Sequence, residues 1–210
     1  SQPPQFDEKI PVYFPRGPPC PILPKTVQPG KELIESGIYH KIMVIGADKA
    51  YSDRERVFFG TIMGDGVVAM LLTEDAECHE ILGSLISTTI YAPNGENSEP
   101  EDIRKFRENN ALMMRKAIFD CMEKAGLANV DYFVTHTSNS TFWDGMAKLL
   151  RCPREKFLDR NIRNTGHMNS NDSFYHYFYW CGQGVIQPGN TVMLINPGFG
   201  GTQGCTVIQR

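Results

Sequence analysis

Hydrophobic residues along this chain form two kinds of pattern. Short apolar runs, rich in branched and aromatic side chains, predict buried strands. The clearest runs span residues 41–46, 67–72, 82–91, 132–134, 191–195 and 205–208. Near-continuous apolar runs of this kind are typical of strands covered on both faces of a sheet.

Between these runs, apolar residues recur at helical spacing. The longest predicted helix follows a capping box made by Ser98 and Glu101, and it ends at Gly126. Shorter helices are predicted over 31–37, from an N-cap at Ser138 or Asn139 to about residue 150, and from 174 to about 184. Strands that alternate with helices indicate an α/β fold with buried sheets.

The first 29 residues are unusual because nine of them are prolines. Proline lacks a backbone N–H and restricts its neighbours, so this density predicts no regular helix or central strand. We expect an extended arm that lies on a surface. The prolines are Pro3, Pro4, Pro11, Pro15, Pro18, Pro19, Pro21, Pro24 and Pro29.

Composition narrows the class of protein. The chain has 210 residues and a net charge of -3, which argues against nucleic acid as its main partner. No apolar run approaches membrane-spanning length, so we expect no membrane association. Six scattered cysteines without a C-x-x-C pair predict neither a disulfide framework nor a zinc site, since adjacent Cys78 and His79 are not at ligand spacing. A reducing, cytoplasmic compartment is therefore expected.

Three loops carry candidate chemistry. His136 follows the strand at 132–134, where sites form in open α/β sheets. Gly166-His167 and the glycine-rich stretch 197–202 follow later. Two imidazoles and a glycine loop with bare backbone N–H groups suit acyl transfer, which requires proton transfer and a held oxyanion. Alternatively, His136 is a packing residue, His167 belongs to a turn, and the glycine loop is a plain hairpin.

Two further stretches allow two interpretations each. The Gly64-Asp65-Gly66 sequence is either a simple turn or a point where two backbones approach closely. The aromatic cluster at 174–180 either lines a substrate tunnel or docks its helix into the core, and the core is favoured.

In order and spacing, four motifs resemble the ketoacyl-ACP synthase III group of the thiolase superfamily. They are Gly64-Asp-Gly66, His136-x-x-Asn139, Gly166-His167 and Gly198-Phe-Gly-Gly201 before a terminal strand. The resemblance covers about residues 30–210. It implies a layered αβαβα fold of two similar halves, a dimer, and acyl transfer from coenzyme A or acyl carrier protein through an acyl-cysteine. Neither a permanent cofactor nor a metal is implied.

The same resemblance divides the chain into three parts. Residues 1–29 form the proline-rich segment, 30–91 the remainder of an N-terminal half, and 92–210 a C-terminal half. Roughly the first ninety residues of the family fold have no counterpart, so the first half is expected to be incomplete. An incomplete sheet exposes an edge. Either the sequence is a fragment, or a partner supplies the missing strands, in which case a homodimer or a complex with a related subunit is expected.

Site residues carry over from the family by position. His136 corresponds to the catalytic histidine and acid/base, and Asn139 to the asparagine of the H-x-x-N pattern. The residues Gly198, Phe199, Gly200 and Gly201 match the loop that supports the oxyanion hole and pocket floor. Cys20 is the nucleophile candidate, with a thiol pKa expected to be lowered by a helix N-terminus.

The sequence departs from the family pattern in three places. His167 stands where the family has asparagine, although Asn169 and Asn171 lie close by. Prolines surround Cys20, and Thr141 replaces a basic residue. A histidine pair suits acylation of an alcohol, amine or unusual carbon acceptor, with His167 as second base or oxyanion donor. A non-catalytic subunit of a larger complex and a thioesterase are the alternatives.

Overall fold

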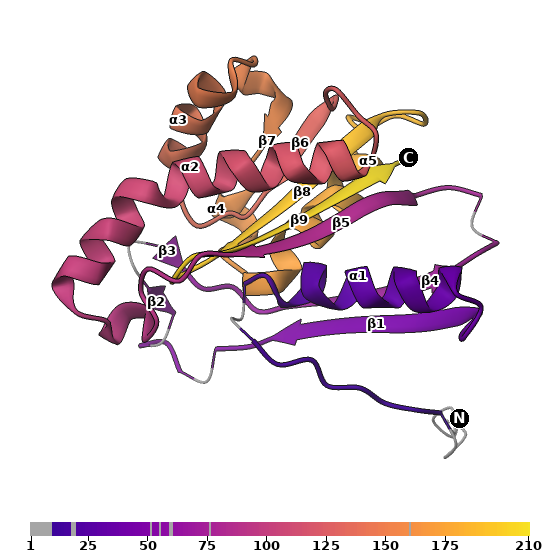
Figure 1. Ribbon diagram of the computed structural model, residues 1–210, viewed down its shortest axis with the longest axis horizontal. Coiled ribbons are helices and arrows are strands. Elements are labelled where there is room, and N and C mark those ends of the chain that lie inside the picture. Colours follow the sequence, from indigo (N-terminus) through magenta and orange to yellow (C-terminus); the bar gives the residue numbers. More distant parts are fainter. Residues whose placement is uncertain are drawn as a thin grey trace.

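A five-stranded mixed sheet forms the centre of the computed structural model, which describes residues 10–17, 20–50, 52–54, 56–58, 61–75, 77–159 and 161–210. Its strand order is β5-β9-β8-β6-β7 (Figure 1). β6 is parallel to β8 and β7, whereas β9 is antiparallel to both β5 and β8. The strands are β5 (Glu80–Thr88), β6 (Tyr132–Thr135), β7 (Phe157–Leu158), β8 (Thr191–Gly198) and β9 (Thr202–Gln209).

Helices cover both faces of this sheet. Helices α2 (Pro100–Lys124) and α3 (Ser140–Leu150) lie on one face, where Met114 and Trp143 pack with Phe133 of β6. Helices α1 (Ile22–Glu35) and α5 (Asp172–Gly182) cover the other face, where Val27 and Phe174 share a core with Val134. Successive residues of β6 thus enter opposite cores, which explains its unbroken apolar run.

A second, two-stranded sheet lies over α1 and completes four layers. Strands β1 (Lys41–Asp48) and β4 (Gly66–Thr73) pair in antiparallel register, and both contact α1. Their inner side chains, such as Val44 and Met70, join the core, but the outer face is exposed. The layered α/β fold with an incomplete first half is therefore confirmed. Shorter elements are β2 (Val57–Phe58), β3 (Thr61–Ile62), α4 (Ile162–Thr165) and the 3-10 turns Gly95–Asn97, Arg154–Lys156 and Asn169–Asn171.

The prediction of an arm without helix around the prolines is wrong. Helix α1 begins at Ile22 and contains both Pro24 and Pro29. Pro24 lies in the first turn, where backbone N–H groups have no helical partner anyway. Pro29 removes one internal hydrogen bond, but α1 is held between the two sheets, with Val27 fully buried. Tertiary burial of an amphipathic helix outweighs the local penalty. Residues 1–9 of the predicted arm lie outside the described residues.

Two boundaries also differ from the prediction. The strand β5 pairs along its whole length with β9, so the C-terminal sheet already includes residues that we had assigned to 30–91. Ser98 does not cap α2; its hydroxyl accepts a hydrogen bond from the Asn94 N–H, and Glu99 is the N-cap. The predicted helix ends are confirmed, since Gly37 and Gly126 both adopt positive φ just after α1 and α2.

The structure also describes the cysteines and the helices, for which the sequence predicted no disulfide framework and no membrane-spanning segment. All six cysteines lie in the described part of the chain, and none forms a disulfide. Among the helices of the described residues, none has the length and apolar character needed to cross a membrane.

Candidate active site

The N-terminus of α1 brings Cys20 to the middle of the molecule. Cys20 is the second residue before α1 and is only 9 % exposed. Two glycines make room for this turn: a Cβ on Gly198 would lie 2.9 Å from the Cδ of Pro21, and one on Gly204 would lie 3.0 Å from Pro24. The C-terminal hairpin therefore packs closely against the proline rings that flank the thiol-bearing turn.

His136 follows β6 at the carboxyl end of the sheet. Its N–H donates to the Ile195 carbonyl at 3.0 Å, and its carbonyl accepts from the Trp143 indole N–H at 3.0 Å. These bonds fix the backbone on both sides of the ring. The imidazole itself is buried, and neither ring nitrogen has a hydrogen-bond partner among the described residues. Buried polar atoms without partners are rare, and they are concentrated where a ligand completes the site.

His167 is held by close contact between two backbones. Its N–H donates to the Ile62 carbonyl, and its carbonyl accepts from the Gly64 N–H, both at 2.8 Å. A Cβ on Gly64 would lie 1.8 Å from the Thr165 carbonyl oxygen, and Gly166 adopts a φ of 65°. Of the two interpretations of Gly64-Asp65-Gly66, the structure supports the close approach. This motif positions His167.

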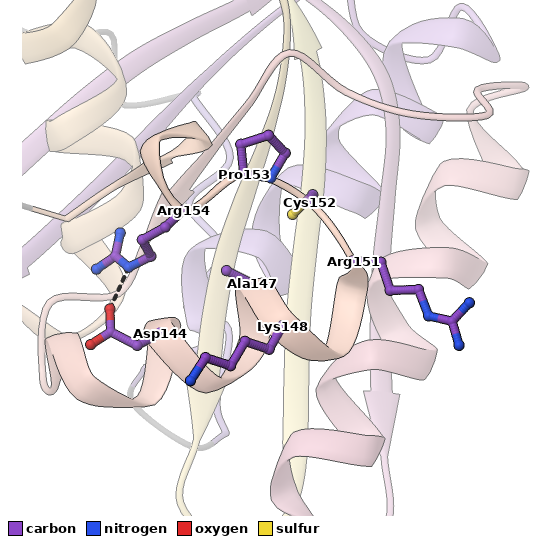
Figure 2. Close-up of a pocket in the computed structure, with 7 residues that line it drawn as sticks. All are labelled: Asp144, Ala147, Lys148, Arg151, Cys152, Pro153 and Arg154. Carbon is purple, nitrogen blue, oxygen red and sulfur yellow. Dashed lines mark hydrogen bonds and ion pairs between the residues drawn. The ribbon is translucent and has the colours of Figure 1, made fainter.

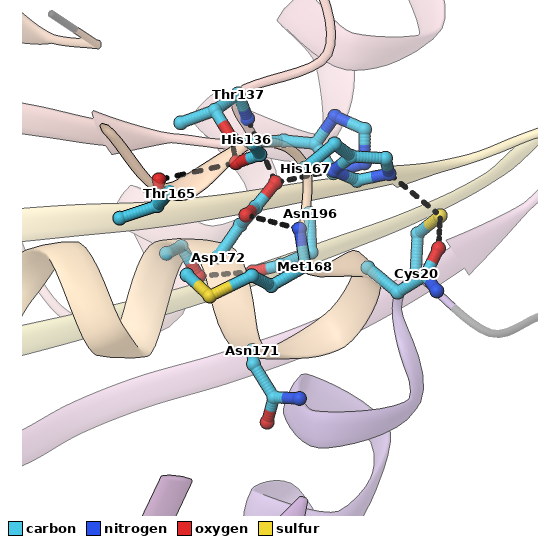
Figure 3. Close-up of polar contacts among 12 residues, drawn as sticks. Cys20, His136, Thr137, Thr165, His167, Met168, Asn171, Asp172 and Asn196 are labelled. Carbon is cyan, nitrogen blue, oxygen red and sulfur yellow. Dashed lines mark hydrogen bonds and ion pairs between the residues drawn. The ribbon is translucent and has the colours of Figure 1, made fainter. Parts of the chain in front are cut away.

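The three predicted catalytic side chains converge (Figure 3). Cys20 Sγ lies 3.9 Å from His167 Nε2, and the rings of His136 and His167 meet edge to face with centroids 4.0 Å apart. Cys20 Sγ and one ring nitrogen from each histidine all lie within 4.8 Å of one another. A thiol and two imidazoles at this spacing also form a donor set that a Zn²⁺ ion accepts.

Asp172 is a member of this cluster that the sequence analysis missed. It is fully buried at the start of α5, and its Oδ2 lies 2.5 Å from His167 Nδ1. Its carboxylate also accepts from the N–H groups of Thr137 at 2.9 Å and Met168 at 2.8 Å. One signal in the sequence could have identified Asp172. It is an acidic residue five positions after a candidate histidine and just before the predicted helix that begins at 174.

Burial and neighbouring charge shape the protonation states. Burial raises the pKa of the Cys20 thiol to about 12, and the negative charges of Asp172 and Asp48 add to this effect. The expected lowering of this pKa is therefore wrong, because desolvation outweighs a helix N-terminus here. Burial and the charge of His167 lower the pKa of His136 to about 3, so this ring is neutral at pH 7.

Asp172 stays ionised despite its burial. Desolvation acts to raise the pKa of its carboxyl group, but the His167 hydrogen bond, the charges of both histidines and the Met168 N–H together lower it to about 2. A carboxylate that accepts several hydrogen bonds keeps its charge even inside a protein.

The asparagines near His167 have separate roles. Asn169, at a φ of 49°, accepts a hydrogen bond from the Cys20 thiol at 3.6 Å and donates to Asp48. Asn171 also donates to Asp48, at 2.8 Å. Asp48 ends β1 and is half-buried, and burial raises the pKa of its carboxyl group. Of the two asparagines, Asn169 is therefore the one that contacts the thiol.

The remaining predicted site residues do not join the cluster directly. Asn139 is exposed, and its side-chain oxygen caps α3 by accepting the Thr141 N–H at 2.9 Å. The glycine-rich stretch is the tight hairpin between β8 and β9, as the alternative interpretation held. Gly200 and Gly201 accept from the N–H groups at 89, 91 and 92, and Phe199 packs on Phe106 with centroids 4.9 Å apart.

A separate cavity lies away from these residues. It has a volume of about 640 Å³ and surrounds the C-terminal end of α3 (Figure 2). Its lining includes Lys148, Arg151 and Arg154, but Arg154 already pairs with Asp144 and Asp159. None of the clustered catalytic candidates lines it, so the chemistry of the thiol cluster, rather than cavity size, identifies the candidate site.

The aromatic cluster of α5 divides between core and surface. Phe174 and Tyr177 are buried in the core, as favoured by the sequence. Tyr175 and Phe178 are partly exposed and line a groove of about 270 Å³ against Val67 and Ala69 of β4. The groove therefore lies between α5 and β4.

A buried cysteine at a helix start, two histidines at strand and loop ends, and a five-stranded mixed sheet covered by helices together define a thiolase-like α/β fold. Two family models match the chain: that of the 3-oxoacyl-[acyl-carrier-protein] synthase III at residues 20–89, and that of its C-terminal part at 122–210. The chain belongs to the 3-oxoacyl-[acyl-carrier-protein] synthase III family.

Individual relatives agree with this assignment. The β-ketoacyl-[acyl-carrier-protein] synthase III of Lactococcus lactis is 28 % identical over 205 residues, which are 85 % of this chain and 62 % of the relative. The chain thus spans less than two thirds of that relative's length. The ChlB3 acyltransferase matches the fold with a TM-score of 0.78 at 17 % identity, over 90 % of this chain and 65 % of that one. The synthase III of Thermus thermophilus matches the fold with a TM-score of 0.72 at 21 % identity. This match covers 91 % of this chain and 65 % of that one.

Proposed function

We propose that this chain takes an acyl group from a coenzyme A or acyl-carrier-protein thioester onto Cys20 and passes it to the oxygen or nitrogen of a biosynthetic acceptor. The observation that carries this proposal is the approach of Cys20 Sγ to His167 Nε2 at 3.9 Å, with a second, unpartnered imidazole beside them. A nucleophile within reach of a base, in a buried site, is the arrangement that covalent catalysis requires.

His167 stands where the family has asparagine, and this difference favours an oxygen or nitrogen atom as the acceptor. Decarboxylative condensation needs hydrogen-bond donors that stabilise an enolate. His167 is instead engaged by a carboxylate at Nδ1, so its Nε2 atom is the one that faces the thiol. A base near an acyl-cysteine can remove the proton of an alcohol or amine as it attacks. Carbon–carbon bond formation from malonyl thioesters is the runner-up, and release of carbon dioxide from malonyl-coenzyme A would favour it.

Two other functions are the alternatives. A thioesterase would use the same residues, with water as the acceptor. A non-catalytic subunit is supported by the raised pKa of the Cys20 thiol, which disfavours the reactive thiolate. The convergence of three catalytic side chains argues for activity over this alternative.

Free thiol released from acetyl- or longer acyl-coenzyme A separates these functions in one assay. An acyltransferase without acceptor should release one equivalent of coenzyme A per active chain and then stop. Continuous release would indicate a thioesterase, and no release would indicate a non-catalytic subunit. Cys20→Ser provides the blank, because its hydroxyl is a far weaker nucleophile than a thiol.

We further propose that the outer face of the small sheet is an interface with a second polypeptide of the same fold family. Ile45 and Val67 are 66 % and 65 % exposed there, and Met43 and Leu71 extend the same face. Large contiguous apolar patches on soluble proteins mark interaction sites. The free edge of β4 beside the groove of α5 would accept further strands, which would also cover Tyr175 and Phe178.

A further inference from the structure

We infer that Asp172 is a positioning residue that makes His167 the base for Cys20, so that the site works as a Cys20–His167–Asp172 relay with His136 left for the acceptor. The inference rests on the proposed acyl transfer and assigns the proton path within it. Figure 3 shows the three side chains in line, joined through the two ring nitrogens of His167.

The hydrogen bond to Asp172 determines which nitrogen of His167 carries its proton. An ionised carboxylate only accepts hydrogen bonds, so the Nδ1 atom at 2.5 Å from Oδ2 must be protonated. In the neutral ring the lone pair then belongs to Nε2, which faces Cys20 Sγ at 3.9 Å. A second group that orients the base in this way is the general feature of activated nucleophiles.

Asp172 is itself held in place. Its two oxygens accept the backbone N–H groups of Met168 and Thr137, and it lies at the N-terminus of the 11-residue helix α5, where a negative charge is favoured. Thr137 directly follows His136, so one carboxylate links the loops that carry both histidines. Within the described part of the chain, the ring of His136 has no such partner, and this neutral ring is free to meet a substrate atom.

The acyl group is transferred to Cys20 through a tetrahedral intermediate. Cys20 Sγ attacks the thioester carbonyl carbon while its proton moves to His167 Nε2, and the carbonyl electron pair moves to oxygen. The tetrahedral intermediate collapses, the bond to the donor sulfur breaks, and that sulfur takes the proton from Nε2. Asp172 remains ionised throughout and stabilises the imidazolium in between. Because the thiol is neutral at rest, the reaction needs this base at the moment of attack.

Asp172→Asn tests the assignment. An asparagine amide can donate to Nδ1, which would move the ring proton to Nε2 and turn an N–H toward the thiol. Acyl loading from acetyl-coenzyme A, followed by rapid quench and intact mass, should slow by about 10²–10⁴-fold. Asp159→Asn is the matched control, because Asp159 is also buried but pairs with Arg154 instead. It should load at the wild-type rate.

A second measurement reads the wild-type protein itself and needs a variant only for assignment. Nitrogen-15 spectra of histidine-labelled wild-type protein should show neutral His167 protonated on Nδ1, with assignment from His167→Gln. A neutral ring protonated on Nε2, or an Asp172→Asn variant that loads as fast as the wild type, would overturn the relay. Absence of loading in the wild type would remove the proposed function instead, and the tautomer would still decide whether Asp172 orients His167.

Discussion

His136 and His167 meet edge to face with ring centroids 4.0 Å apart, but among the described residues only the ring of His167 has polar partners. Both nitrogens of His167 are engaged, one by Asp172 and one by Cys20. Both nitrogens of His136 lack a partner among the described residues. Two adjacent imidazoles in such different surroundings are suited to different steps of one reaction.

The first prediction separates the two rings. His167→Ala should slow acyl loading by about 10²–10⁴-fold, because it removes the base that takes the thiol proton. His136→Ala should load at close to the wild-type rate but fail to pass the acyl group to an alcohol or amine acceptor. Single-turnover loading and transfer, followed by mass spectrometry, give both rates.

The exposed His40 offers a control, since His40→Ala changes neither ring. Equal defects in loading for both active-site variants would contradict the division of roles. So would normal loading in His167→Ala.

The second prediction concerns stability in mild acid. The pKa of His136 is lowered to about 3 in the folded protein from an ordinary value of 6.5. Between these values the unfolded chain binds a proton that the folded chain does not, so folding weakens as pH falls. Between pH 7.5 and pH 5 this group alone should reduce the free energy of unfolding by about 2 kcal/mol.

Urea denaturation at the two pH values measures this effect. His136→Asn should remove about 2 kcal/mol of the pH dependence. Asp172 contributes only at lower pH: the pKa of its carboxyl group falls to about 2, so its stabilisation is lost as pH drops from about 4 toward 2. An unchanged pH dependence in His136→Asn would show that the ring is not kept neutral by burial.

The third prediction concerns the backbone contact behind His167. Gly64→Ala would bring a Cβ to 1.8 Å from the Thr165 carbonyl oxygen, which forces the Gly166-His167 segment to move. We expect a loss of about 1–3 kcal/mol in stability and slower acyl loading. Gly145→Ala is the control: nothing lies within 4 Å of its Cβ, and α3 should gain about 0.5–1 kcal/mol. If Gly64→Ala is destabilised but still loads the acyl group at the normal rate, then this backbone contact does not position the catalytic residues.

Much of this architecture could be predicted from local patterns. The apolar runs at 41–46, 67–72 and 191–195 all lie within strands, and Gly37 and Gly126 end their helices. The convergence of Cys20, His136 and His167, which lie far apart in sequence, came only from the family resemblance. No local pattern specifies how distant loops meet.

The wrong predictions share one physical cause: contacts between distant parts of the chain outweigh local sequence preferences. Pro29 was expected to prevent a helix, but burial of α1 between two sheets outweighs one lost hydrogen bond. The thiol of Cys20 was expected to be acidic, but its depth and two nearby carboxylates raise its pKa. Asp172 was not singled out from the sequence, because its contact with His167 becomes visible only in the fold.

The fourth prediction concerns assembly. The exposed face of β1 and β4 should hold a partner chain, so Ile45→Lys and Val67→Lys should reduce the mass of the particle measured by light scattering. Leu112→Lys on α2, also exposed, should leave that mass unchanged. A monodisperse, well-folded monomer of the wild type at micromolar concentration would contradict an obligate interface.

The position of the acyl group tests the central claim most directly. Wild-type protein incubated with acyl-coenzyme A should gain one acyl mass, and peptide mapping should assign it to the peptide that contains Cys20. Cys20→Ala should lose the label, whereas Cys121→Ala and Cys181→Ala should keep it, because neither of these cysteines belongs to the site. A label that persists in Cys20→Ala, or that maps to another residue, would contradict Cys20 as the nucleophile.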